Sequence, residues 1–311
     1  MRLRSITRSE NGNALAIVGL ALVVLLGSAA LVTDGGYLYL TKQRMVNAVD
    51  SAALAAGQEL PDRASTAQAV AYSYAEDNGC PASEVAVNIS EDHREVRVTA
   101  TREVPLFFAR VLGLVSSQVG AQATARIDPV SAVEGVAPLS ISDQTLTFGI
   151  AYQLKDSPGD ISDPDHGSGW LGPISLGGNG ANVYRFNLMY GYDGTLKTGD
   201  LINTETGNMS GPTTQSIAYR IDQCSHTPSC TVDHFAPDCP RILLVPVVEP
   251  IVEGNQVKRV RILGFSSFLI DSYVESGNEN YVKGYFVKRV VSGATTTGAA
   301  DYGLYGVHLI D

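Results

Sequence analysis

Three cysteines and two histidines lie close together in the C-terminal third of the chain: Cys224, His226, Cys230, His234 and Cys239. Thiolate and imidazole groups are ligands that Zn²⁺ prefers, so the cluster could form a tetrahedral zinc site. It contains no Cys-x-x-Cys pair, and in an oxidising compartment a disulfide between two of the three cysteines is the simpler arrangement. We therefore predict a disulfide, Cys224–Cys230 or Cys230–Cys239, and no bound metal; zinc ligation and free thiols are the alternatives.

The fourth cysteine, Cys80, lies far from this cluster in the sequence. It either pairs with the third cysteine of the cluster or is a lone thiol. Because four cysteines allow three complete pairings, the sequence leaves the connectivity open.

Elsewhere the sequence lacks the residue patterns of a catalytic or cofactor site. Residues 155–170 contain four aspartates, but not in the order of an EF-hand loop, which favours a solvated acidic loop. The segment 264–268 lacks the second glycine of G-x-S-x-G, and no glycine-rich phosphate-binding loop is present. We therefore predict that the protein is not an enzyme and uses no cofactor or small-molecule substrate.

The charge balance excludes a further class of partner. The chain has 311 residues with 22 Lys+Arg against 32 Asp+Glu, a formal net charge of −10. A chain this acidic has no overall attraction for phosphate backbones, so we expect no nucleic-acid partner. Because 44% of the residues are hydrophobic and only 17% are charged, the composition also argues against wholesale disorder.

Along the chain, the first predicted element is an apolar stretch. Residues 14–32 contain no charged side chain, and at 1.5 Å per residue a helix of this length spans roughly the 30 Å hydrocarbon core of a bilayer. Three arginines precede it, and short basic flanks stay in the cytoplasm. We therefore predict a cytoplasmic basic tail over 1–13, a transmembrane helix over 14–33 in the plasma membrane, and an ectodomain outside.

A cleavable signal peptide is the alternative reading of the same stretch. Residues 27–30 are small, as signal peptidase requires, and cleavage would fall after Ala29. The apolar run is longer than a usual signal-peptide core, however, and a helical pattern continues beyond it. We therefore expect an uncleaved, single-pass anchor.

Directly after the span come the residues DGGYLY (34–39) and RMVNAVDSAALAAG (44–57). This segment resembles the TadE/TadG-like proteins of Tad (Flp) pilus assembly, in which the span is followed by Asp-x-Gly, Tyr, Arg, Asn-Ala-x-Asp and an alanine-rich run. The matching positions are Asp34, Gly36, Tyr39, Arg44, Asn47, Ala48, Asp50, Ala52, Ala53 and Ala55. Because Glu10 precedes Gly12, the reverse of the order at a prepilin peptidase site, we expect no prepilin cleavage.

The resemblance implies a TadG-like membrane protein that takes part in assembling or anchoring a Tad pilus. Its partners would be pilin-like or pilus-assembly proteins, and it would act by protein–protein binding. The alternatives are a membrane-anchored or secreted envelope protein with no pilus role and, third, an exported hydrolase.

Helical spacing of apolar residues predicts that the span continues as an amphipathic helix over 34–60. Its alanines combine high helix propensity with little bulk, so this face could pack closely against the protein's own ectodomain or against a partner subunit. Gly57 and Pro61 are suited to ending the helix.

Residues 61–128 predict a small α+β unit. The pattern indicates a helix over 62–78, a hairpin formed by 85–89 and 96–100, a short helix over 105–112 and a strand over 115–127. In the short helix we expect Phe107, Phe108 and Val111 to point inward.

Helical patterns are absent after residue 128, so residues 129–311 predict a β-rich extracytoplasmic domain, either a sandwich or an irregular barrel. The Asn-Gly at 179–180 and the Asp-Gly at 193–194 predict hairpin turns. The expected strands are 183–188, 217–221, 242–248, 257–263 and 281–291. The whole chain is therefore predicted to be an α+β protein.

Overall fold

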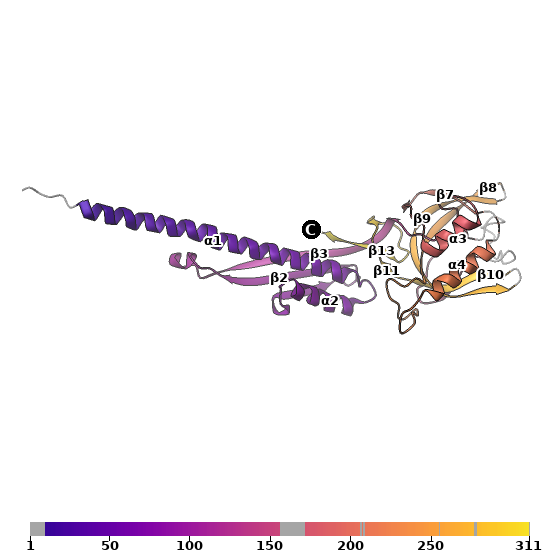
Figure 1. Ribbon diagram of the computed structural model, residues 1–311, viewed down its shortest axis with the longest axis horizontal. Helices are drawn as coiled ribbons and strands as arrows, with labels where there is room; N and C mark the ends of the chain where they lie inside the picture. The colour runs from indigo at the N-terminus through magenta and orange to yellow at the C-terminus, as the bar shows by residue number, and fades with distance from the viewer. Residues whose placement is uncertain are drawn as a thin grey trace, which may run out of the picture.

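The computed structural model describes residues 10–155, 172–205, 207, 209–254, 256–276 and 279–310. Most of the predicted basic tail and nearly all of the predicted acidic loop lie outside these residues. The molecule is elongated: a long helix forms one end, a small α+β unit lies against its second half, and a β-rich part with two helices forms the other end (Figure 1). The predicted α+β class is confirmed.

A single helix, α1 (Glu10–Gly57), contains the predicted span and the predicted amphipathic segment up to Gly57, three residues short of its predicted end. By length and composition its apolar part can cross a membrane, and none of that part is buried inside the chain. In the second half of α1, by contrast, Met45, Ala48, Val49, Ala52 and Ala53 have no exposed surface. One helix therefore has an uncovered apolar half and a half that belongs to a folded core.

The α+β unit covers that second half of α1. It contains α2 (Ala64–Asp77), the 3₁₀ helices η1 (Ala82–Glu84) and η2 (Ala109–Leu112), and the strands β1 (Val85–Ile89), β2 (Glu95–Pro105) and β3 (Ser116–Val133). The strand order is β1-β2-β3-β13-β11, with β1, β2, β3 and β13 paired antiparallel. Helices α1 and α2 pack on each other, and α1 also packs on β2, β3 and β13. The predicted helix and hairpin of this unit are confirmed.

The short helix was predicted with its apolar side chains inward, and this was wrong. Phe107 is 60% exposed, Phe108 is 37% exposed and Val111 is 73% exposed. They lie at the tip of the β2–β3 hairpin, where the chain reverses, and α1 covers them only in part.

The last strand of the chain returns to the first sheet. β13 (Leu304–Ile310) pairs with residues 124–129 of β3, and the short strands β11 (Arg289–Val290) and β12 (Ala294–Thr295) pair with β13 and β3. The Arg94 guanidinium forms an ion pair with Asp301 and lies 5.1 Å from the ring centre of Tyr305. β3 runs unbroken through the predicted boundary at 128–129, and the division there stays a prediction.

The second sheet has the order β4-β8-β9-β10-β5, with β7 paired to β9. Its strands are β4 (Ile141–Ser142), β5 (Ala151–Leu154), β7 (Leu201–Asn203), β8 (Ile242–Glu253), β9 (Gln256–Ser276) and β10 (Glu279–Val287); β6 (Leu196–Lys197) pairs with β3. Phe268 and Phe286 are fully buried, with ring centres 5.1 Å apart.

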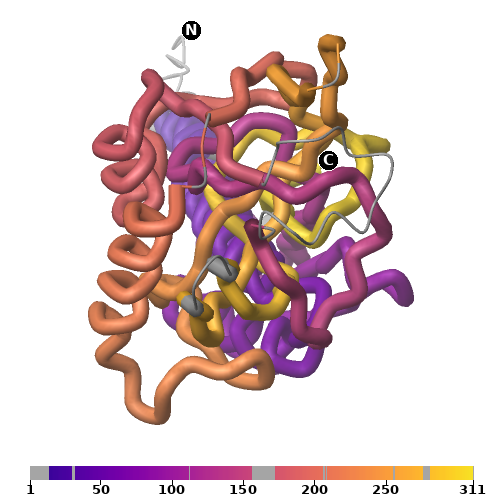
Figure 2. Tube along the Cα trace, turned by 90° about the vertical axis from the view of Figure 1, so that its right-hand side faces the viewer, coloured from indigo at the N-terminus to yellow at the C-terminus, as the bar shows by residue number. Residues whose placement is uncertain are grey.

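Two helices, α3 (Ala181–Tyr190) and α4 (Ser210–Asp222), occupy positions where the sequence predicted strands 183–188 and 217–221. They lie side by side along one flank of the C-terminal part (Figure 2). The buried face of α4 consists of Thr213, Ser216, Ile217 and Arg220, which have helical spacing but are mostly polar. Hydropathy therefore gave no sign of that face.

Neither dipeptide predicted as a hairpin turn forms one. Gly180 directly precedes α3 and has a φ of 110°, a backbone conformation that favours glycine. Asp193 and Gly194 lie between Tyr192, which bridges to Val136, and β6, which pairs with β3. The segments that flank each dipeptide therefore do not pair with each other.

Replacing Ala52 by Leu should destabilise the protein, because Ala52 has no exposed surface and the larger side chain would overpack the core between α1, α2 and the sheet. We expect the free energy of unfolding to fall by about 1–3 kcal/mol. The measurement is urea unfolding of the full chain in detergent, followed by near-UV circular dichroism. Gln43→Leu, at an exposed position of the same helix, is the control. Equal midpoints for the two variants would contradict the packing described here.

Candidate functional site: the Asp34 contact and the cysteine–histidine cluster

Asp34 follows the predicted span directly, yet its side chain is only 4% exposed. Its carboxylate accepts hydrogen bonds from the backbone N–H groups of Phe107, Phe108 and Ala109 at 2.9, 3.0 and 2.8 Å. These N–H groups lie at the start of η2, where a helix has no internal acceptors, and η2 has no capping side chain of its own. Asp34 therefore supplies the cap from another element and fixes the tip of the β2–β3 hairpin to α1.

The charge of Asp34 suits this contact. Burial by itself would raise the pKa of the carboxyl group, but the three N–H donors and the nearby charge of Arg110 hold that pKa below its usual value. Asp34 was identified in the sequence only as a motif position. Its partners lie more than seventy residues away in the chain, and no local pattern could have revealed them.

The other motif positions divide between two faces of α1. Ala48, Ala52 and Ala53 are fully buried, so the alanine face packs within the core of the protein's own α+β unit, and Asp50 and Ala55 are partly exposed. Gly36, Tyr39, Arg44 and Asn47 are exposed. We use "outer face" for the five exposed residues that share one side of the helix by spacing: Tyr39, Leu40, Gln43, Arg44 and Asn47.

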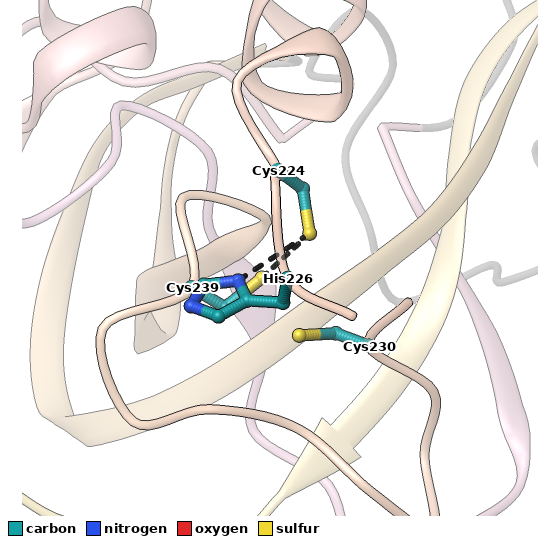
Figure 3. Close-up of side chains that lie close together, drawn as sticks. All are labelled: Cys224, His226, Cys230 and Cys239. Atoms are coloured by element: carbon teal, nitrogen blue, oxygen red, sulfur yellow. Dashed lines mark hydrogen bonds between the residues drawn. The ribbon is translucent and has the colours of Figure 1, made fainter. Parts of the chain in front are cut away.

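The structure brings together four of the five side chains of the cysteine–histidine cluster. One ligand atom each from Cys224, His226, Cys230 and Cys239 lies within 4.8 Å of the other three. The Sγ atoms of Cys224 and Cys239 are 3.5 Å apart, and the Cys224 Sγ is 3.7 Å from the His226 Nδ1 (Figure 3). His234, by contrast, is exposed and does not belong to the group.

None of the four cysteines forms a disulfide in the structure. The 3.5 Å between the Sγ atoms of Cys224 and Cys239 is well beyond an S–S bond of about 2.05 Å. Cys80 lies in the buried cluster beneath α1 and α2, whereas Cys230 and Cys239 lie in a separate one with Ile242. The disulfide therefore stays a prediction, and the structure offers no nearby partner for Cys80.

The loop that carries the cluster joins the end of α4 to the start of β8, and two arginines hold it in place. Arg220 of α4 donates from Nη1 to the carbonyl oxygen of Pro240 at 2.7 Å. Arg241 donates from Nη1 to the carbonyl oxygen of Cys230 at 2.9 Å and from Nε to that of Ile270 in β9 at 2.8 Å. The loop is thereby attached to both α4 and the second sheet.

The thiols of the cluster are electrostatically unequal. Burial alone would raise the pKa of Cys224, but hydrogen bonds with the side chain and backbone of His226 lower it to about 6. Burial raises the pKa of Cys239. Cys224 is therefore the thiol that ionises more readily, and thiolate is the form that binds metals.

The serines of the segment 264–268 do not form a nucleophile site. Ser266 and Ser267 are fully buried in β9, and the Ser266 hydroxyl donates to the carbonyl oxygen of Tyr302 at 2.6 Å. Both serines therefore belong to the interior of the second sheet.

Comparison with protein-family models gives two matches. The family described as "Putative Flp pilus-assembly TadE/G-like" matches residues 12–59, and the family described as "Putative Tad-like Flp pilus-assembly" matches residues 38–125. Over residues 12–125, the chain is a TadE/TadG-like Tad protein. This confirms the resemblance, and we call residues 12–125 the Tad region. No curated protein and no solved structure matches the chain.

The Tad region contains α1, α2, the β1–β2 hairpin and the first half of β3. Asp34, the hairpin tip and the outer face all belong to it. The cysteine–histidine cluster lies beyond residue 125, so the family match says nothing about it.

Replacing Asp34 by Asn should loosen the hairpin tip, because a neutral amide oxygen is a weaker acceptor for the three N–H groups than a carboxylate. We expect the amides of Phe107, Phe108 and Ala109 to exchange with deuterium roughly tenfold faster or more, without global unfolding. Hydrogen exchange followed by mass spectrometry on the full chain in detergent measures this. Asn47→Ala, on the outer face, is the control and should leave these amides unchanged.

The same contact should respond to pH in the unaltered protein. Because the folded-state pKa of Asp34 is depressed, the tip should remain protected above the usual aspartate value of 3.8 and lose protection as the pH falls below it. Unchanged protection in both the variant and the acidified protein would contradict the capping role.

Proposed function

We propose that this Tad protein is anchored in the plasma membrane by residues 14–33 and acts by binding other proteins of Tad pilus assembly. The family match and the uncovered apolar half of α1 support this. The arginines at positions 2, 4 and 8 favour an N-terminus in the cytoplasm and a C-terminal ectodomain outside. In that orientation the elongated molecule extends away from the membrane.

The observation that carries the proposal is the division of α1 into two faces. Beyond the span, the alanine face is buried in the protein's own core, whereas the outer face is exposed. Tyr39 is 64% exposed and Leu40 is 55% exposed. The side chains of Gln43, Arg44 and Asn47 form no hydrogen bond or ion pair with any described residue.

The chemistry of the outer face suits a protein partner. It places an aromatic ring, an aliphatic side chain, a guanidinium and two amides on one rigid helix. Tyr and Arg are enriched among residues that contribute most to protein–protein affinity, because they combine a large contact area with directed hydrogen bonds. Three of its members are also family-motif positions, yet the protein's own packing does not use them.

We propose binding rather than catalysis as the work of the ectodomain. The families that match are pilus-assembly families. In the described residues the serines considered as nucleophiles are buried, and the cysteine–histidine cluster is set into a loop that arginines hold.

The proposal is tested by site-specific photo-crosslinking in cells that assemble the pilus. A crosslinking residue at Gln43 or Asn47 should capture a pilin-like or pilus-assembly protein, identified by mass spectrometry. The matched control is Tyr74, a 48% exposed residue of α2 on another surface of the same unit. Arg44→Glu should reduce both capture and the number of pili while leaving the amount of protein unchanged.

Two results would contradict the proposal. One is equal capture of the same proteins from positions 43 and 74. The other is capture from position 43 of envelope proteins unrelated to the pilus, with normal piliation of the Arg44→Glu strain; this would favour an envelope protein without a pilus role.

A further inference from the structure

We propose that Cys224, His226, Cys230 and Cys239 bind one Zn²⁺ ion in a tetrahedral Cys₃His site. The site lies outside the Tad region and does not depend on the function proposed above. The sequence left zinc and a disulfide open, and three observations on the loop favour zinc.

The first observation is the spacing of the ligand atoms. Zn–S bonds of about 2.3 Å at tetrahedral angles place two sulfur ligands about 3.8 Å apart, and a nitrogen ligand slightly closer to each sulfur. The Cys224–Cys239 separation of 3.5 Å and the Cys224–His226 separation of 3.7 Å are close to these values. All four ligand atoms lie within 4.8 Å of one another, and their side chains converge from different parts of the loop (Figure 3). One ion can therefore reach all four.

The second observation is that a disulfide would leave half of the cluster unexplained. A bond between Cys224 and Cys239 would leave the thiol of Cys230 and the imidazole of His226 gathered around it for no structural reason. A zinc ion uses all four groups. With no ligand position left for water, it would be a structural site rather than a catalytic one.

The third observation is the surroundings of the ligands. His226 presents Nδ1 to the cluster, and its Nε2 lies 3.3 Å from the Asp238 carboxylate. A carboxylate on the far nitrogen is the usual means of orienting a histidine that binds zinc. Three thiolates and Zn²⁺ carry a net charge of −1. The positive charge of the Arg289 guanidinium, whose buried Nε has no hydrogen-bond partner in the described structure, interacts favourably with Asp238 and Cys239 and would offset part of this negative charge.

The ion would stabilise a loop that has little other structure. Between α4 and β8, among residues 223–241, the structure has no helix or strand apart from the bridge between Thr231 and His234. Zinc would tie the end of α4 to the segment that enters β8, which is where Arg220 and Arg241 also act.

The test is the metal content of the full chain purified in detergent without added chelator. We expect close to one zinc per chain for the unaltered protein and for two controls, Cys80→Ser and His234→Ala. His226→Ala and Cys230→Ser should lose it. Asp238 is not a ligand but faces the other ring nitrogen of His226. Replacing it by Ala should therefore weaken zinc affinity about 10–100-fold while the protein remains folded.

A second measurement identifies the ligands. After removal of zinc under reducing conditions, added Co²⁺ should give the absorption of a tetrahedral thiolate site, and the spectrum should be lost in Cys230→Ser. A protein that contains a disulfide within residues 224–239, carries no zinc, and takes up no Co²⁺ after reduction would overturn the proposal and restore the disulfide.

A separate observation concerns the hairpin tip, residues 106–115. We infer that this tip is a second membrane contact that enters the lipid surface beside α1; this inference rests on the proposed membrane anchoring of residues 14–33. Five apolar side chains of the tip face outward: Phe107, Phe108, Val111, Leu114 and Val115, which are 60%, 37%, 73%, 58% and 63% exposed.

The position of the tip along α1 identifies the occupant as lipid. Asp34, which holds the tip, is the first residue after the predicted span, so the tip lies at the level where the helix leaves the hydrocarbon. Figure 1 shows the end of the β2–β3 hairpin reaching along α1 toward its uncovered half. Tyr37 of α1 meets Phe107 edge to face, with ring centres 5.9 Å apart.

The chemistry of the tip also matches that level of the bilayer. Aromatic side chains are enriched where hydrocarbon meets the headgroups, and the exposed Arg110 can contact anionic headgroups despite the acidic charge of the whole chain.

Tryptophan fluorescence in brominated-lipid vesicles tests this inference on the full chain. The single tryptophan, Trp170, is replaced by Phe, and one tryptophan is introduced at Phe107, at Leu22 in the span, or at Tyr74 on α2. Brominated phosphatidylcholine should quench the first two and leave the third unaffected, compared with unbrominated vesicles.

The three positions separate the possible failures. Quenching at 22 but not at 107 would overturn the membrane contact of the tip while leaving the anchor intact. The absence of quenching at both positions would overturn the anchor as well.

Discussion

The packing of the second half of α1 against β3 is the interaction on which the rest of the structure depends. Ala48, Ala52 and Ala53 are fully buried in the core that α1 forms with this sheet and with α2, and their small side chains allow close packing. The first half of the same helix buries nothing within the chain. A continuous helix thus joins an apolar segment to a folded core, and it fixes how far every other element lies from the end of that segment.

Two other elements follow from this arrangement. At one end of the interface, the buried carboxylate of Asp34 lies beside an apolar segment. Three N–H groups of the hairpin tip donate hydrogen bonds to it and so offset the cost of burying its charge. At the other end, β3 pairs with β2 along one edge and with the C-terminal β13 along the other. Because β13 comes from the end of the chain, the Tad region and the C-terminal part share one sheet and support each other.

The sequence predicted those elements whose pattern has a simple physical cause. The span is apolar on all sides. The helix beyond it and the strands β1 and β2 each have a buried apolar side and a more exposed polar side, which gives a regular pattern in the sequence. Prediction failed where the buried side chains are polar, as in α4, or where the exposed side chains are apolar, as at the hairpin tip. α4 buries Thr213, Ser216 and Arg220, whose polar atoms are satisfied by groups such as the carbonyl oxygens of Leu188 and Pro240. Hydropathy cannot register a buried face of that kind.

At the candidate sites, the sequence by itself determined which groups are available: the carboxylate of the Tad motif, the outer face of its helix, and three thiols with two imidazoles in one loop. Only the tertiary structure decided how they are used. It directs Asp34 to backbone N–H groups far along the chain, and it brings His226 rather than His234 to the cysteines. The reason is physical: residue type fixes the chemistry of a group, whereas its neighbours depend on the path of the chain between residues that are distant in sequence.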